Sequence, residues 1–292
     1  MSRIFDALQK SESERSGAPS APLSSLAMEL LQIAEGQNEQ VPAAVPTPSP
    51  DEFPTCRAEP VKGTRLVSLT DPEGLAAEKF RFLGVRLRQL QQAQGLKKLL
   101  VTSTISEEGK SVISANLAFT LARKNRQKVL LLEGDLRRPV MCARLGLGIR
   151  FTGLVEWLHS ESSQLPGTYH LADTGVYLLP AGTPPENPLE LIQLPKMAEL
   201  LERLASTFDW VVIDSPPILP LADTSVWSRL ADGILLVTRQ GVTDRRELKR
   251  GVEALDEKKL LGMIVNSCDN IDHTNYYRRY SPVSSRSEQE TV

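Results

Sequence analysis

The sequence predicts an α/β fold with a mainly parallel sheet flanked by helices, and two observations support this prediction. From about residue 65, short aliphatic runs alternate with longer amphipathic stretches, as expected for strands joined by crossover helices. The runs are nearly continuous, which indicates strands that are buried on both faces. The six runs are KKLLVTS (97–103), KVLLLEGD (128–135), GVYLLPAG (175–182), DWVVIDSPP (209–217), DGILLVTR (232–239) and LLGMIVNS (260–267).

Composition and charge exclude several classes of protein. The chain has 292 residues, of which 41% are hydrophobic, and a formal net charge of -2, so nothing suggests a nucleic-acid partner. Cys56, Cys142 and Cys268 are far apart and odd in number, which argues against a disulfide framework or a zinc site. No stretch reaches the ~20 apolar residues of a membrane span, and we therefore expect a cytoplasmic protein.

Both ends of the chain differ from its centre. Residues 15–60 are rich in Pro, Ser and Ala, a composition that offers little to bury. We expect residues 1–60 to form a disordered extension with short helices near MSRIFDALQK and SSLAMELLQIAEG. Residues 61–270 should form the folded domain, and residues 271–292 a short flexible tail.

The segment VTSTISEEGKSVISANLA, residues 101–118, resembles a phosphate-binding loop that leads into a helix. In the pattern G-x-x-x-x-G-K-[ST], backbone N–H groups cradle phosphates, the Lys neutralises them and the hydroxyl binds Mg²⁺. Gly109, Lys110 and Ser111 match this pattern, but Thr104 occupies the position of the first glycine. Alone, the match is weak.

Acidic residues at two other strand ends strengthen the match to a phosphate-binding loop. Glu133 and Asp135 end one aliphatic run, and Asp214 ends another. A carboxylate at such a place holds Mg²⁺, directly or through water, beside a phosphate loop. Any single one is more often a solvated loop acid or a helix cap, but three beside a lysine loop indicate a nucleotide site.

At this point the chain resembles the bacterial protein-tyrosine kinases (BY-kinases) of capsule and exopolysaccharide synthesis. The resemblance covers roughly residues 65–280, and it implies a P-loop NTPase fold that binds ATP and Mg²⁺ through Walker A, A′ and B motifs. The motifs that carry it are TSTISEEGKSVISANLA, VLLLEGDLRRP, LLPAGTPPENPLELI, FDWVVIDSPPILPLADTSV and LADGILLVTRQGVTDRRELKRGVEALDEKKLLGMIVN.

The resemblance implies a role for each motif residue. Lys110 would contact the β- and γ-phosphates, Ser111 would bind Mg²⁺, and Asp214 would hold the metal through water. Asp135 would position Mg²⁺ or the attacking hydroxyl, and Glu133 is the first acid of the same pair. Asn266 would reach the adenine, although a strand-end Asn is more often a cap or turn residue. The other nucleotide-binding residues implied are Thr104, Ser106, Glu107, Glu108, Gly109 and Val112.

The motifs also depart from the family pattern. Ser106 and Glu107 stand where the family usually has Pro-Gly, and a non-Gly residue at positive φ costs about 1–2 kcal/mol. A carboxylate ~4 Å from a phosphate adds roughly 4 kcal/mol of repulsion, so Glu107 must point outward for ATP to bind tightly. Glu133 replaces the usual Asp and moves its charge by one methylene, which implies reduced activity.

A further family motif, E-x-x-R-x-x-R, packs subunits into a ring. Glu78 and Arg81 match it, but Gly84 replaces the second Arg. We expect Arg86 and Arg88 to project from a different helix face. The motif therefore predicts either an oligomer contact at Glu78 and Arg81 or only a surface salt bridge between them.

The chain ends in HTNYYRRYSPVSSRSEQETV, as the family ends in a tyrosine cluster. Tyr276, Tyr277 and Tyr280 lie among Asn and Arg rather than among aliphatic neighbours. A flexible segment of this kind suits phospho-acceptors that reach another subunit. The alternative is an aromatic docking tail.

The resemblance implies a non-specific protein-tyrosine kinase that phosphorylates itself and regulates polysaccharide polymerisation and export. Its implied partner is a membrane adaptor of the chain-length-determinant type, which would recruit it to the cytoplasmic face of the inner membrane; a homo-oligomer is left open. One alternative is an ATP-binding scaffold with weakened catalysis. The other is a partition or cell-division ATPase, which is disfavoured because Ile105 stands where those proteins carry a second lysine.

Overall fold

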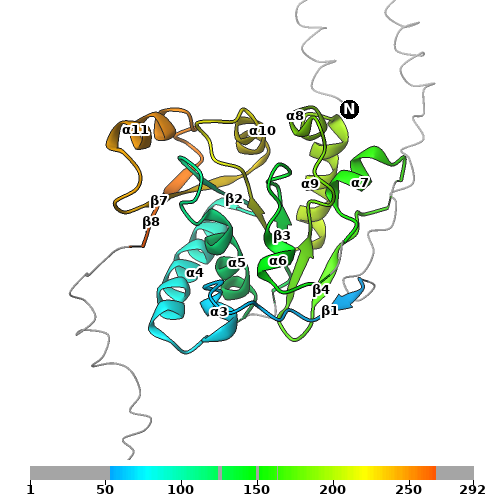
Figure 1. The fold of residues 1–292 in the computed structure, drawn as a ribbon, viewed down its shortest axis with the longest axis horizontal. Coiled ribbons are helices and arrows are strands. Elements are labelled where there is room, and N and C mark those ends of the chain that lie inside the picture. The colour runs from blue at the N-terminus through cyan, green and yellow to red at the C-terminus, as the bar shows by residue number, and fades with distance from the viewer. Residues whose placement is uncertain (1–52, 124–126, 149–150, 163, 268–292) are drawn as a thin grey trace, which may run out of the picture. The chain divides into compact units, whose positions relative to one another are not determined.

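In the computed structural model of the chain, residues 53–123, 127–148, 151–162 and 164–267 are described (Figure 1). The strands are β1 (Thr55–Cys56), β2 (Lys98–Ser103), β3 (Val129–Glu133), β4 (Tyr169–Leu171), β5 (Val176–Leu179), β6 (Trp210–Asp214), β7 (Gly233–Arg239) and β8 (Leu260–Asn266). The helices are α3 (Val67–Thr70), α4 (Leu75–Gln94), α5 (Lys110–Arg123), α6 (Met141–Arg144), α7 (Leu154–His159), α8 (Pro188–Ile192), α9 (Pro195–Thr207), α10 (Asp223–Leu230) and α11 (Arg245–Glu253).

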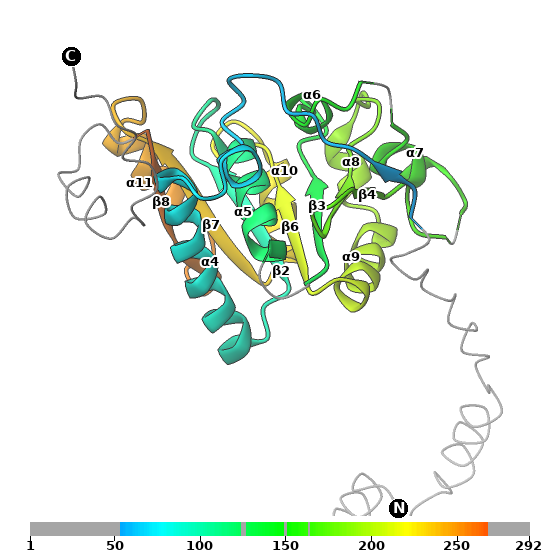
Figure 2. The same ribbon diagram turned by 90° about the horizontal axis from the view of Figure 1, so that it is seen from below.

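The described strands form one sheet in the order β1-β4-β5-β3-β6-β2-β7-β8. Every neighbouring pair is parallel except β4 and β5, which are antiparallel. The predicted mainly parallel sheet is confirmed, and each of the six aliphatic runs is a strand. The parallel register brings the carboxyl ends of β2, β3 and β6 to the same edge of the sheet, beneath the loops that carry the predicted site (Figure 2).

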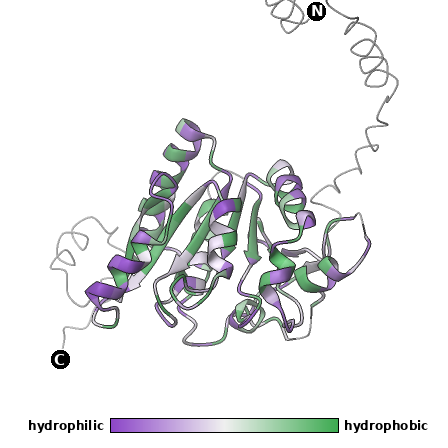
Figure 3. Ribbon diagram, turned by 90° about the horizontal axis from the view of Figure 1, so that it is seen from above, coloured by the Kyte–Doolittle hydropathy of each residue, from purple (hydrophilic) through white to green (hydrophobic). Residues whose placement is uncertain are grey.

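The continuous apolar runs are explained by burial on both faces of the sheet. In β3, Leu130 and Leu132 face the hydrophobic cluster formed with α7, α9 and α10, whereas Val129 and Leu131 face the cluster formed with α4, α5 and α6. Figure 3 shows the strands mostly in the hydrophobic colour, with mixed colours on the surrounding helices. Neither face of the central strands is left for polar residues, because both are covered.

Local sequence signals set several helix boundaries. Helix α4 ends at Gly95, whose φ of +69° is a left-handed conformation that glycine adopts without strain. Helix α9 begins with Pro195, where the missing N–H is not needed, and α11 begins with a capping box between Asp244 and Glu247. None of the described helices is both long and apolar enough to cross a membrane.

The folded part of the chain begins earlier than we expected. Thr55–Cys56 forms the edge strand β1, which pairs with β4, although we predicted that the disordered extension would run to residue 60. Phe53 packs on Tyr177 and Phe208, with ring centroids 5.9 and 6.1 Å apart. A strand of only two residues shows no recognisable periodicity, so β1 could not be predicted from the sequence. The predicted helices near residues 2 and 24 lie outside the described residues.

Candidate active site

The predicted phosphate loop connects β2 to α5, and its backbone conformation needs a glycine at one position. Gly109 has a φ of +93°, and a Cβ atom there would lie 2.3 Å from Asn266 Nδ2. Helix α5 begins directly after it, at Lys110. The loop therefore presents the unpaired N–H groups of a helix start, which bind anions well.

Glu107 adopts the left-handed conformation that a glycine would normally supply. Its φ is +67°, and both Ser106 and Glu107 are exposed. Glu107 also lines the pocket beside this loop, so its charge is not held away from a bound phosphate as tight ATP binding would require, and its backbone lies in a region that costs a non-Gly residue about 1–2 kcal/mol.

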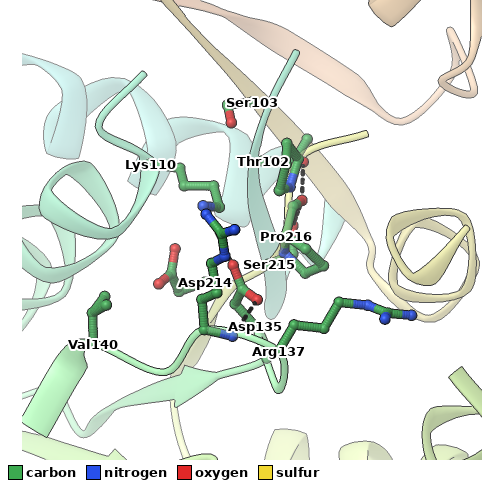
Figure 4. Close-up of polar contacts among 12 residues, drawn as sticks. Thr102, Ser103, Lys110, Asp135, Arg137, Val140, Asp214, Ser215 and Pro216 are labelled. Carbon is green, nitrogen blue, oxygen red and sulfur yellow. Dashed lines mark hydrogen bonds and ion pairs between the residues drawn. The ribbon is translucent and has the colours of Figure 1, made fainter. Parts of the chain in front are cut away.

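A pocket of about 470 Å³ lies beside this loop. Its walls come from the loop and start of α5 (106–111), the segment after β3 (135–144) and the loop after β6 (217–221). Figure 4 shows the Lys110 side chain reaching toward Asp135 and Asp214. Lys110 Nζ lies 3.4 Å from Asp135 Oδ2, and the other oxygen of Asp135 accepts a hydrogen bond of 3.2 Å from Arg138 N.

Asp214 is buried beside the pocket with one carboxylate oxygen unsatisfied. Oδ1 accepts a hydrogen bond of 3.1 Å from Ser114 Oγ, but Oδ2 has no hydrogen-bond partner among the described residues. Burial raises the pKa of Asp214 to about 7, against the opposing effects of the Lys110 ammonium and the nearby Ser111 hydroxyl. A buried carboxylate with a free oxygen is suited to a cation or to a water bound to one.

The residues present fit Mg²⁺ only together with phosphate oxygens. In the part of the chain that the structure describes, no group of three His, Cys, Asp or Glu side chains is arranged to hold a metal ion. Ser111, Asp135 and Asp214 supply few ligands, and Mg²⁺ characteristically takes one or two carboxylates plus water and substrate phosphates. The donor set therefore matches the magnesium of a bound nucleotide better than a metal held by protein alone.

Comparison with known proteins gives the same family as the motifs. Residues 99–281 match the family CbiA, the CobQ/CobB/MinD/ParA nucleotide binding domain. Tyrosine-protein kinase YwqD of Bacillus subtilis is 32% identical over 221 residues, which cover 74% of this chain and 92% of YwqD. Putative tyrosine-protein kinase CapB of Staphylococcus aureus is 30% identical over 211 residues, 72% of this chain and 92% of CapB. The chain belongs to the bacterial tyrosine-protein kinase family.

Solved structures of this family resemble the fold. The chimerical protein CapA2B2 is similar with a TM-score of 0.65 and 27% identity, and the similarity covers 75% of this chain and 96% of that one. The kinase domain of Escherichia coli tyrosine kinase ETK has a TM-score of 0.61 and 27% identity, over 70% and 82% of the two chains. The BY-kinase resemblance and the P-loop fold predicted from the motifs are thereby confirmed.

Glu133, the first acid of the BY-kinase A′ pair, lies apart from the Lys110 pocket. It does not line the pocket of Lys110, and it is only 2% exposed. Its Oε1 accepts hydrogen bonds of 2.6 Å from the N–H groups of Val140 and Met141, and Oε2 accepts one of 3.1 Å from Ala181 N. Burial raises its pKa, and these hydrogen bonds oppose that shift. Glu133 therefore anchors the start of α6, and the catalytic role that the resemblance implies for it stays a prediction.

Glu108 is fully buried and ties the BY-kinase loop to β7. Its Oε2 accepts a hydrogen bond of 2.8 Å from Ile105 N, and its Oε1 accepts from Thr243 Oγ1 and, at 3.3 Å, from Arg239 N. The carboxylate is thus committed to the protein, and the nucleotide contact that we predicted for Glu108 stays a prediction. Sequence patterns do not reveal this link, because Glu108 and Thr243 are far apart in the chain.

Asn266 is also committed to the loop. Its Nδ2 donates a hydrogen bond of 2.9 Å to Glu108 O, and its Oδ1 accepts one of 2.9 Å from Ser267 N. We predicted a contact with adenine; in this structure the amide instead fixes the backbone next to Gly109.

Thr104 and Val112 belong to the predicted loop without lining the pocket. Thr104 is buried, and its side chain packs against α11. A Cβ atom on Gly251 of that helix would lie 3.1 Å from the Thr104 side chain. The pocket thus brings together Ser106, Glu107, Gly109, Lys110, Ser111 and Asp135.

The sequence did not reveal the pairing of Arg137 with Asp223. Arg137 Nε and Nη2 donate hydrogen bonds of 2.7 and 3.0 Å to the two oxygens of Asp223, which is only 3% exposed. Both residues stand in quoted family motifs, but their pairing depends on how the segment after β3 meets the start of α10.

Glu78 and Arg81 form a local ion pair within α4. Arg81 Nε donates to Glu78 Oε2 at 2.6 Å, and Nη1 donates to Pro72 O at 2.5 Å. Our prediction for Arg88 was wrong, because its guanidinium lies 3.6 Å from where a Cβ of Gly84 would stand and so shares that face. The oligomer contact stays a prediction, and Tyr276, Tyr277 and Tyr280 lie outside the described residues.

Proposed function

We propose that this chain is a Mg-ATP-dependent protein-tyrosine kinase that phosphorylates tyrosines of its own tail. The observation that carries the proposal is the arrangement of Lys110, Asp135 and Asp214 beside a helix start and one open pocket. Relatives named tyrosine-protein kinases, such as YwqD, support the choice of tyrosine as acceptor.

Each residue has a distinct task in this proposal. Lys110 neutralises the β- and γ-phosphates, and Ser111, Asp135 and Asp214 hold Mg²⁺ together with phosphate oxygens. The metal, when bound, screens the phosphate charge and orients the phosphates for in-line attack. The tyrosine oxygen forms a bond to the γ-phosphorus as the bond to the β–γ bridging oxygen breaks, and ADP leaves. Asp135, at the pocket wall, accepts the hydroxyl proton.

We also propose that the kinase acts in polysaccharide synthesis at the cytoplasmic face of the inner membrane. Succinoglycan biosynthesis transport protein ExoP of Rhizobium meliloti is 34% identical over 203 residues, which make up only 26% of ExoP. A membrane adaptor of the chain-length-determinant type would then be a separate partner of this chain. The partition-type alternative lacks support, because Ile105 is not a lysine.

A scaffold with weakened catalysis is the second candidate, and one observation favours it. Glu107 holds a strained left-handed conformation in the phosphate loop, which disfavours the close placement of the phosphates that transfer requires. The scaffold and the kinase differ in turnover and not in nucleotide binding.

Replacing Tyr276, Tyr277 and Tyr280 with Phe tests the proposal. We expect the triple variant to bind Mg-ATP with wild-type affinity and to lose autophosphorylation, because only the acceptor hydroxyls are removed. Wild-type phosphate incorporation in the triple variant would exclude the tail as acceptor and direct attention to Tyr169 or Tyr177. Binding of Mg-ATP without any phosphate incorporation in the wild-type chain would favour the scaffold.

A further inference from the structure

Arg144, the last residue of α6, lines the pocket that also contains Lys110 and Asp135. Its Nε is shielded from solvent and has no hydrogen-bond partner, and its guanidinium forms no ion pair with any described residue. A cationic donor is rarely enclosed without an acceptor, because losing its hydration is costly. Arg144 is therefore placed for an acceptor that the described residues do not provide.

The other cations that line this pocket differ from Arg144. Lys110 is paired with Asp135, and Arg137 makes a two-fold hydrogen bond with Asp223. The Arg138 side chain is exposed to solvent. Among the described residues that line this pocket, half-buried Arg144 thus combines a shielded Nε with a guanidinium that pairs with no described residue.

The position of Arg144 is set by the anchoring of α6. Glu133 Oε1 accepts hydrogen bonds from Val140 N and Met141 N, which fixes the first turn of this short helix. Met141 and Leu145 are fully buried and hold the same segment against the core. The guanidinium therefore projects from a fixed backbone, so little ordering is required when an anion binds.

The charge of the pocket favours an anion with several oxygens. Arg137 is neutralised by Asp223, and Asp135 offsets Lys110, whereas Arg144 forms no ion pair with a described carboxylate; the exposed Glu107 and Arg138 at the pocket balance one another. A guanidinium presents two parallel N–H donors that match two oxygens of a phosphate. Because Arg144 comes from α6 and not from the loop that cradles the inner phosphates, its natural target is the outermost phosphoryl group.

We propose that Arg144 is a catalytic residue that contacts the transferred γ-phosphoryl group and stabilises the charge on its oxygens during transfer. This inference rests on the proposed function, in that the pocket must bind ATP. The helix start holds the inner phosphates and Lys110 contacts both the β- and the γ-phosphate, whereas Arg144 acts only on the group that moves.

Calorimetry tests whether Arg144 contacts only the γ-phosphoryl group. It compares binding of ADP with binding of a non-hydrolysable β,γ-imido analogue of ATP, both with Mg²⁺. We expect Arg144→Met to weaken binding of the analogue about 10- to 100-fold while ADP affinity stays within about twofold. Arg144→Lys should recover part of the lost affinity for the analogue, because it keeps the positive charge but lacks the two parallel N–H donors of the guanidinium. Arg86→Met on exposed α4 removes the same charge outside the pocket and should change neither affinity.

An equal loss of affinity for ADP and the analogue in Arg144→Met, or no loss for either, would overturn the proposal. Thermal unfolding of each variant separates misfolding from lost contacts, and Arg144→Lys carries the comparison if the Met variant does not fold. A wild-type chain that binds both nucleotides without forming phosphotyrosine contradicts the proposed kinase function but leaves the binding comparison intact. A wild-type chain that binds neither nucleotide contradicts both.

Discussion

The ammonium of Lys110 lies 3.4 Å from the carboxylate of Asp135, with the two side chains only 13% and 9% exposed. This pair joins the phosphate loop to the segment after β3 across the pocket. It means that Lys110 holds a partner inside the protein before any nucleotide binds.

Lys110→Met should abolish measurable binding of Mg-ATP while the fold is kept. The variant loses the phosphate counter-charge, and it also leaves Asp135 without its cation, which we expect to lower the free energy of unfolding by about 1–2 kcal/mol. Adding Asp135→Asn to Lys110→Met should restore most of this stability but none of the binding. Nucleotide titration and urea denaturation measure the two effects; unchanged nucleotide affinity would refute the loop assignment.

Glu107→Gly should tighten Mg-ATP binding several-fold. The substitution removes a left-handed non-Gly residue, whose φ is +67°, and one negative charge at the pocket. Glu107→Gln is the matched control, because it removes the charge and keeps the backbone restriction. Calorimetry that finds no gain in either variant would show that neither the charge nor the conformation of Glu107 limits binding.

Glu133→Asp separates the anchoring role of Glu133 from a catalytic one. The shorter side chain cannot reach Val140, Met141 and Ala181 together, so buried N–H groups lose their acceptor and we expect the free energy of unfolding to fall by roughly 1–3 kcal/mol. Kinase activity should fall as well, because α6 is loosened. Higher activity with unchanged stability, measured by urea denaturation and phosphate incorporation, would support the catalytic role and contradict the anchoring one.

The stability of the nucleotide-free protein should decrease as the pH rises from about 4 to about 7. Asp214 has a pKa of about 7 in the folded chain, above the ordinary value of about 3.9, so the folded state binds the extra proton. Its contribution is complete below pH ~4 and is lost as the pH rises through 7, with a size on the order of a few kcal/mol.

Asp214→Asn is the control for this pH dependence. The variant should lose the part of the slope that Asp214 supplies, while the buried Glu133, whose pKa is also raised, retains a smaller slope of the same sign. Denaturation curves at pH 4, 5, 6 and 7 compare the two proteins. Identical slopes would show that Asp214 does not titrate in this range.

The strands and the position of the loop followed from the sequence because they depend on local patterns. Continuous aliphatic runs mark strands buried on both faces, and the glycine-lysine pair marks a helix start. The edge strand β1 and the short strand β4 carry too few residues for such a pattern. Strand order also places the carboxyl ends of β2, β3 and β6 together, which is why the acids meet Lys110.

The roles of individual side chains were harder to predict, because they depend on residues far apart in the chain. Glu108 reaches Thr243, Asn266 reaches the backbone of Glu108, and Glu133 reaches Ala181. Motif matching treats these residues as ligands for a nucleotide, but burial and nearby N–H donors decide what their polar groups contact. Arg88 lies on the same face of α4 as Gly84, and not on a different face as we predicted. The i,i+4 spacing of the two residues is sufficient to predict this.

The central claim is that this pocket transfers phosphate from ATP to the tail tyrosines. Tandem mass spectrometry of residues 270–285, after incubation of the purified full chain with Mg-ATP, tests it most directly. The account predicts phosphate on at least one of Tyr276, Tyr277 and Tyr280 in the wild-type chain and none in Lys110→Met. An unmodified tail in the wild-type chain, or equal modification in Lys110→Met, would contradict it.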